Sequence, residues 1–183
     1  MFKFMHGGVV WRVEFSHTKH DPPQKGTGQL GKEFLVQAST KCDIWRQEQE
    51  VDEASIVSSR EAMCLVGDRW RKSIGRGIAL RRALSNCKLV KVDTPPPEWL
   101  HVTSKWEPLF TRDFRRLVWA CYWVMSNRLD RVTGTGLGEA VVALGSAGTK
   151  IPPLRVYPSE TPAMWGTIKD LVISEPKEQN VQG

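Results

Sequence analysis

The chain has 183 residues, of which 40% are hydrophobic and 25% are charged, and its formal net charge at pH 7 is +6. This composition is ordinary for a globular protein and excludes a wholly disordered chain, and the length suits one compact domain or a small domain with an accessory element. The sequence has neither the roughly 18 consecutive apolar residues of a membrane span nor the apolar run of a signal peptide, so we expect a cytoplasmic protein with no membrane partner.

The first part of the chain has the pattern of β-strands. Residues 9–15 alternate between apolar and polar side chains, which is typical of a half-buried strand. Residues 17–32 are rich in proline, glycine and polar side chains and predict a long hairpin loop. Further strands are predicted from residue 33 to about residue 45 and over residues 54–66, where β-branched and aromatic side chains recur.

The basic residues gather in the segment 60–91, which holds nine Lys or Arg and two acids, a net charge of +7 against +6 for the whole chain. Asp68 is a suitable N-cap for a short helical turn, and Gly75 and Gly77 are expected to interrupt that turn. A longer helix is predicted over residues 78–86. The first unit is therefore expected to be α+β, with a small antiparallel sheet of about three strands and a packed basic helix.

Three consecutive prolines mark the segment 93–98 as a stiff linker. They predict a division into an α+β basic unit, residues 1–92, and a second part, residues 99–183. Within the second part, residues 107–129 predict a helix that is apolar and aromatic on nearly all sides. The remainder is irregular and rich in Gly and Pro, with a short helix or strand over residues 139–144, so the C-terminal half is expected to be largely helical.

No motif for a cofactor, a metal or catalysis is complete. The run from Gly134 to Gly138 has Glu139 where a dinucleotide fingerprint has its third glycine. His17 and His20 have a spacing that can chelate a metal, but no second pair of ligands accompanies them. The sequence therefore predicts no cofactor, no metal and no enzyme activity. A nuclease or other enzyme is a third hypothesis, which a metal requirement and turnover would distinguish.

The cysteines form no Cys-x-x-Cys pair, so neither a zinc ribbon nor a redox motif is present. We expect each of them to be a small buried hydrophobe in a reducing compartment. They are Cys42, Cys64, Cys87 and Cys121.

Two interpretations of the basic segment are open. It either meets phosphates, because a guanidinium offers a planar fork of donors, or it is the solvated face of a helix. On the first interpretation the chain is a nucleic-acid-binding protein that contacts DNA or RNA without strong sequence preference. Trp70 either stacks on a base or anchors the helix on the sheet. The candidate contacts are Arg69, Trp70, Arg71, Lys72, Arg76, Arg81 and Arg82.

An alternative function uses the aromatic helix. If that helix is exposed, the chain is a protein-binding adaptor, or an inhibitor of a host protein. Its contacts would be Trp119, Tyr122 and Trp123.

The segment from Cys64 to Leu84 resembles a pattern of small, largely uncharacterised bacteriophage and prophage proteins. The resemblance depends on Asp68, Trp70, Gly75, Arg76 and the run 79–84. Gly77 stands where that pattern has a basic residue. The resemblance covers roughly the first half of the chain, and it implies a phage-encoded protein of the host cytoplasm without supplying an activity.

Overall fold

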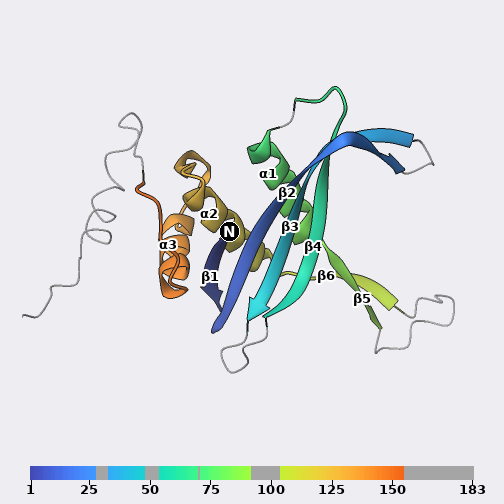
Figure 1. The fold of residues 1–183 in the computed structure, drawn as a ribbon. Coiled ribbons are helices and arrows are strands. Elements are labelled where there is room, and N and C mark those ends of the chain that lie inside the picture. Colours follow the sequence, from blue (N-terminus) through green and yellow to red (C-terminus); the bar gives the residue numbers. More distant parts are fainter. Residues whose placement is uncertain (28–32, 48–53, 70, 92–103, 155–183) are drawn as a thin grey trace, which may run out of the picture.

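A computed structural model describes residues 1–27, 33–47, 54–69, 71–91 and 104–154 (Figure 1). The main sheet has four antiparallel strands in the order β1-β2-β3-β4. They are β1 (Phe2–His6), β2 (Val9–Thr27), β3 (Glu33–Gln47) and β4 (Ala54–Leu65). A separate pair of strands consists of β5 (Cys87–Lys91) and β6 (Ser104–Pro108). The helices are α1 (Lys72–Leu84), α2 (Arg112–Met125), the 3-10 helix η1 (Leu129–Arg131) and α3 (Gly136–Ser146).

The mixed α+β class is confirmed, but the sheet has four strands rather than about three. β1 was not predicted, and it is only five residues long. It turns into β2 through Gly7 and Gly8, whose φ angles of +59° and +74° favour glycine. The side chains of Phe2 and Phe4 are buried, so this short strand belongs to the core.

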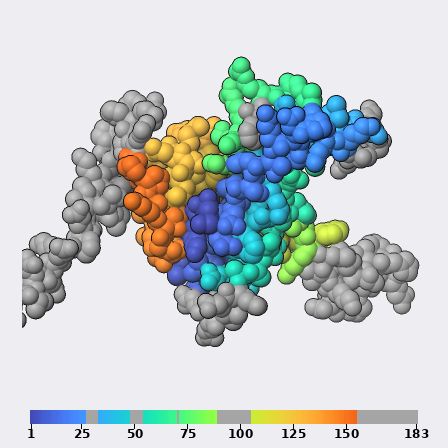
Figure 2. All heavy atoms as spheres, in the orientation of Figure 1, coloured from blue at the N-terminus to red at the C-terminus, as the bar shows by residue number. Residues whose placement is uncertain are grey.

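The long loop predicted over residues 17–32 is wrong for its first part, because β2 continues to Thr27 and pairs with β3. The register shifts between Lys19 and Gln24, around Pro22 and Pro23. Prolines are tolerated at such an irregularity because the ladder there requires no N–H donor. The paired strands form an arm that extends away from α2 and α3 (Figures 1 and 2). Residues 28–32 lie outside the described residues.

One face of the sheet carries the core. Cross-strand pairs such as Val13 with Ile44 point toward the helices, and both side chains are fully buried. α1 packs on β3 and β4, whereas α2 and α3 pack beside β1. Leu80, Val118 and Leu144, from the three helices, belong to the same hydrophobic cluster. The linker predicted at residues 93–98 lies outside the described residues, and the elements before and after it share this cluster.

The interruption predicted at Gly75 and Gly77 is wrong, because α1 runs through both residues. Gly75 allows the helix to approach β3 closely, since a Cβ at this position would lie 2.5 Å from Thr40 Oγ1. Nothing lies within 4 Å of a Cβ at Gly77. The packing of α1 on the sheet therefore outweighs the low helix propensity of glycine.

The aromatic helix begins at Arg112 rather than at residue 107, because residues 104–108 pair with β5. Thr111 is its N-cap, and the threonine hydroxyl accepts a hydrogen bond from Phe114 N at 3.2 Å. The helix ends at Met125, and Asn127, with φ of 55°, closes its C-terminus in the left-handed conformation.

Candidate functional site

The side of α1 that faces the sheet changes character along the helix. At about 100° per residue, Lys72 and Arg76 project to the same side as the buried Ala79, Leu80 and Ala83. The C-terminal half of this side is therefore apolar and fills the core. The N-terminal half is basic and remains exposed at the margin of the sheet.

Arg76 reaches across to β2. Its Nε donates a hydrogen bond to Nε2 of His17 at 3.2 Å, and its guanidinium carbon lies 5.9 Å from the centre of the Phe15 ring. Nδ1 of His17 lies 2.9 Å from Oγ1 of Thr40, which is 1% exposed on β3. A chain of hydrogen bonds thus joins the exposed arginine to the buried part of the sheet.

These contacts define the protonation state of His17. An arginine Nε–H only donates, so Nε2 of His17 must accept and Nδ1 carries the proton. Nδ1 then donates to the Thr40 hydroxyl. Burial lowers the pKa of His17, and the positive charges of Arg76 and Lys72 lower it further. The neutral imidazole is therefore the form that fits this site.

Tyr122 of α2 closes the site from the other side. Its hydroxyl donates to the backbone oxygen of Ser73 at 3.5 Å, and its ring lies 5.9 Å from that of Phe15. Burial raises the pKa of Tyr122, although a hydrogen bond with Ser126 and the charge of Arg76 act in the opposite direction. The first turn of α1 is thereby attached to α2 as well as to the sheet.

The predicted contacts do not share one face. Arg81 projects about 140° away from Arg76 around the helix axis. Arg82 donates to the backbone oxygen of Glu61 at 2.6 Å, which joins α1 to β4. Arg69 and Arg71 are exposed just before the helix begins. Trp70 lies outside the described residues.

The arginines of this region form no ion pair with a described carboxylate, unlike several cations elsewhere in the protein. Among the described residues, no carboxylate forms an ion pair with any of the five arginines at positions 69, 71, 76, 81 and 82, whereas Lys41 pairs with Asp43 at 3.1 Å and Arg116 with Glu139 at 3.5 Å. The first turn of α1 has no acidic residue, and its N-cap residue makes no side-chain capping hydrogen bond. The helix dipole adds partial positive charge at the same end. The start of α1 is therefore a strongly positive site.

His17 was not predicted as part of this site, because the sequence analysis considered it only as a metal ligand with His20. Val13, Phe15 and His17 alternate along β2, so all three lie on the helix-covered face. This alternation is the sequence signal that could have placed His17 in the site. Within the described ranges, no group of three His, Cys, Asp or Glu side chains is arranged to hold a metal ion.

The aromatic side chains of α2 do not form an exposed patch. Tyr122 is 5% exposed, and Trp119 and Trp123 are half-buried and stacked with ring centres 5.4 Å apart. The Arg131 guanidinium covers Trp123 at 5.3 Å. These contacts leave only parts of the two indoles available to a partner.

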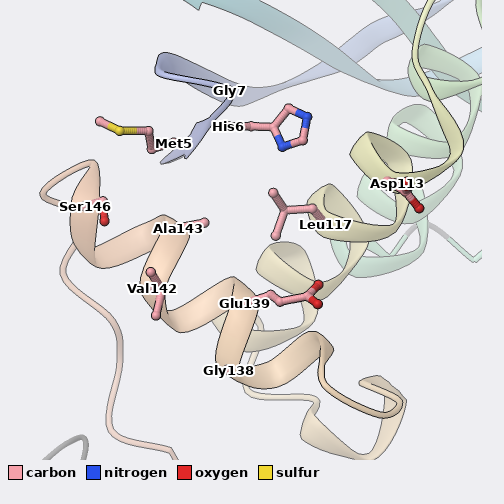
Figure 3. Close-up of a pocket in the computed structure, with 10 residues that line it drawn as sticks. All are labelled: Met5, His6, Gly7, Asp113, Leu117, Gly138, Glu139, Val142, Ala143 and Ser146. Carbon is pink, nitrogen blue, oxygen red and sulfur yellow. The ribbon is translucent and has the colours of Figure 1, made fainter.

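A shallow hollow of about 620 Å³ lies between β1, α2 and α3. Figure 3 shows Met5, Leu117 and Val142 around it, with Asp113 and Glu139 toward one side. The Glu139 carboxylate pairs with Arg116 and accepts from the Thr135 hydroxyl at 3.1 Å. The hollow is mainly apolar.

Comparisons of this chain with protein-family models, with curated proteins and with solved structures give no match. No helix in the described ranges is long and apolar enough to cross a membrane.

Proposed function

We propose that the protein binds nucleic acid, without strong sequence preference and without catalysis, through the basic surface at the start of α1. This surface, named here the α1 basic surface, consists of Arg69, Arg71, Lys72 and Arg76. The observation that carries the proposal is that the arginines of this surface have no carboxylate partner among the described residues while they surround the positive end of a helix. Phosphate groups satisfy both features, because they neutralise the charge and accept from guanidinium forks.

Arg81 and Arg82 have a smaller role in this proposal than the sequence suggested. Arg81 projects away from the α1 basic surface, and Arg82 is engaged with the Glu61 carbonyl. Both add to the long-range positive field that attracts a polyanion. Trp70 keeps its proposed role as a base-stacking residue, since it lies between Arg69 and Arg71 in the sequence.

The test is a fluorescence-anisotropy titration with short single-stranded and duplex DNA and RNA over a series of salt concentrations. If the four cations each meet one phosphate, log K on duplex DNA falls by about 3.6 for each tenfold rise in salt. Arg76→Ala is expected to reduce this slope by about 0.9 and to weaken binding to all sequences alike. Arg81→Ala is the matched control, with a smaller effect. Binding that is insensitive to salt would contradict the proposal.

A second candidate function is binding of a host protein through Trp119 and Trp123, with the buried Tyr122 packed against both indoles. The observation in its favour is that the two stacked indoles remain partly exposed on α2. A pull-down that depends on both tryptophans, together with no binding of nucleic acid at low salt, would favour this alternative. The resemblance of residues 64–84 supports a phage-encoded protein of the host cytoplasm in either case.

A further inference from the structure

We infer that His17 is a proton-dependent positioning residue for Arg76. The neutral imidazole holds the arginine side chain against the sheet, whereas the protonated imidazole releases it and adds a positive charge beside it. Phosphate binding at the α1 basic surface is therefore stronger at acidic pH than at neutral pH. This inference rests on the proposed function and describes the regulation of the same site.

The two ring nitrogens of His17 make different hydrogen bonds. Arg76 Nε donates to Nε2 of His17 at 3.2 Å, and this bond exists only while Nε2 has its lone pair. When Nε2 is protonated, two N–H groups and two positive charges face each other. The Nδ1–H donor to Thr40 Oγ1 is unchanged by that protonation, so the ring keeps its anchor on β3. The side chain that moves is Arg76, which is exposed on α1.

The groups around His17 favour the neutral state in the free protein. From α1, the charges of Arg76 and Lys72 act on the ring, and partial burial adds to their effect, so that all three lower its pKa. From α2, Tyr122 has a raised pKa and is neutral at pH 7. From β3, burial raises the pKa of the Cys42 thiol to about 12.

The described neighbours of His17 on β2 and the residue paired with Thr40 on β4 are not acidic. Lys19 lies two residues after His17 on β2, which places it on the same face, and it is exposed. Ala62 of β4 is paired with Thr40 and carries no charge. A phosphate bound by Arg76 would place negative charge near His17, and it would raise the pKa of the imidazole. Binding of the phosphate and uptake of the proton therefore favour each other.

The first experiment uses the free protein and needs no ligand. NMR titration of the His17 ring is compared between the unmodified protein and Arg76→Gln, with His20→Gln as a control for assignment. We expect the His17 pKa to lie below its ordinary value in the unmodified protein and to rise in Arg76→Gln. An unchanged His17 pKa in Arg76→Gln would overturn the inference, because Arg76 would then not be coupled to the imidazole.

The second experiment measures binding of a fluorescent single-stranded oligonucleotide at about pH 7.5 and about pH 5.5, at constant ionic strength. A rise of one unit in the His17 pKa on binding, from a value already below 6.5, makes affinity at the lower pH about three- to sixfold higher than at the higher pH. His17→Gln retains an acceptor for Arg76 but cannot be protonated, so its affinities at the two pH values are expected to differ less than about twofold. His20→Gln is expected to keep the full pH dependence.

The two experiments separate the failure of the inference from the failure of the proposed function. Equal pH dependence in His17→Gln and in the unmodified protein would overturn the role of His17 and leave nucleic-acid binding intact. No binding at either pH would overturn the proposed function together with its regulation, even if the NMR titration shows His17 coupled to Arg76.

Discussion

Gly75 of α1 lies so close to Thr40 of β3 that a Cβ on the glycine would be 2.5 Å from the threonine Oγ1. Thr40 is also the partner of His17, which is the partner of Arg76. The close approach therefore determines the height of α1 above the sheet and, with it, the position of the arginine. A single missing methyl group at Gly75 allows the basic end of the helix to reach β2.

Gly75→Ala is predicted to lower the free energy of unfolding, because Thr40 is buried, β-branched and unable to move aside. Overpacking costs about 1–3 kcal/mol, and the better helix propensity of alanine offsets up to about 1 kcal/mol of this. Gly77→Ala is the matched control, since nothing lies within 4 Å of its Cβ, and it is predicted to be stabilising. Urea unfolding measures both variants. A stabilised Gly75→Ala protein would contradict the close approach.

Ser58→Ala is predicted to lower the free energy of unfolding by about 0.5–1.5 kcal/mol, because it removes a buried hydrogen bond to the Ala83 carbonyl and leaves that oxygen, among the described residues, only the 3.4 Å bond from Asn86 N. Ser58 is 3% exposed on β4, and its hydroxyl donates to the backbone oxygen of Ala83 at 2.9 Å, near the C-terminus of α1. Ser59→Ala is the control on the adjacent, half-buried position of the same strand. Equal denaturation midpoints for the two variants would argue against this contact.

Local patterns in the sequence predicted the interior of the sheet well. Alternation placed Val13 and Phe15 on the core side of one strand, and β-branched residues located β3 and β4. Local patterns failed where a contact distant in sequence decides the conformation. The glycines of α1 are tolerated because of Thr40, and residues 104–108 are a strand because β5 pairs with them.

The candidate site was only partly predictable for the same reason. The charge count located the basic segment, and helical periodicity then separates Arg76 from Arg81 once the start of α1 is known. The participation of His17 depends on the Arg76 side chain reaching from α1 to β2, which no spacing in the sequence indicates. The prediction of four buried cysteines holds for Cys42 and Cys121 and is wrong for the other two. Cys64 is half-buried, and Cys87 is exposed because it begins the β5–β6 pair.

The cysteines are predicted to react with iodoacetamide in two groups. Burial raises the pKa of Cys42 and of Cys121 to about 12, so both remain protonated thiols at neutral pH and are inert. Cys87 is exposed and Cys64 is half-buried, so they are expected to be modified first, in that order. Mass spectrometry of peptides after timed labelling distinguishes the four sites. Rapid modification of Cys42 in the folded protein would contradict its burial beneath α1 and α2.

The stability of the protein is predicted to fall in mildly acidic solution because of His17. The ordinary pKa of the imidazole is 6.5, and the folded protein lowers it. As the pH falls below 6.5, His17 is therefore protonated in the unfolded chain before it is protonated in the folded protein. The free energy of unfolding decreases as a result, until the pH has fallen below the lowered pKa of the folded protein. His17→Gln cannot take up this proton, so its melting temperature is expected to depend less on pH between about pH 7.5 and about pH 5. Circular dichroism at fixed ionic strength measures both proteins, and the other titrating groups cancel in the difference. Parallel curves of melting temperature against pH for the two proteins would show that folding does not keep His17 neutral. That result would contradict the hydrogen bond from Arg76 to Nε2.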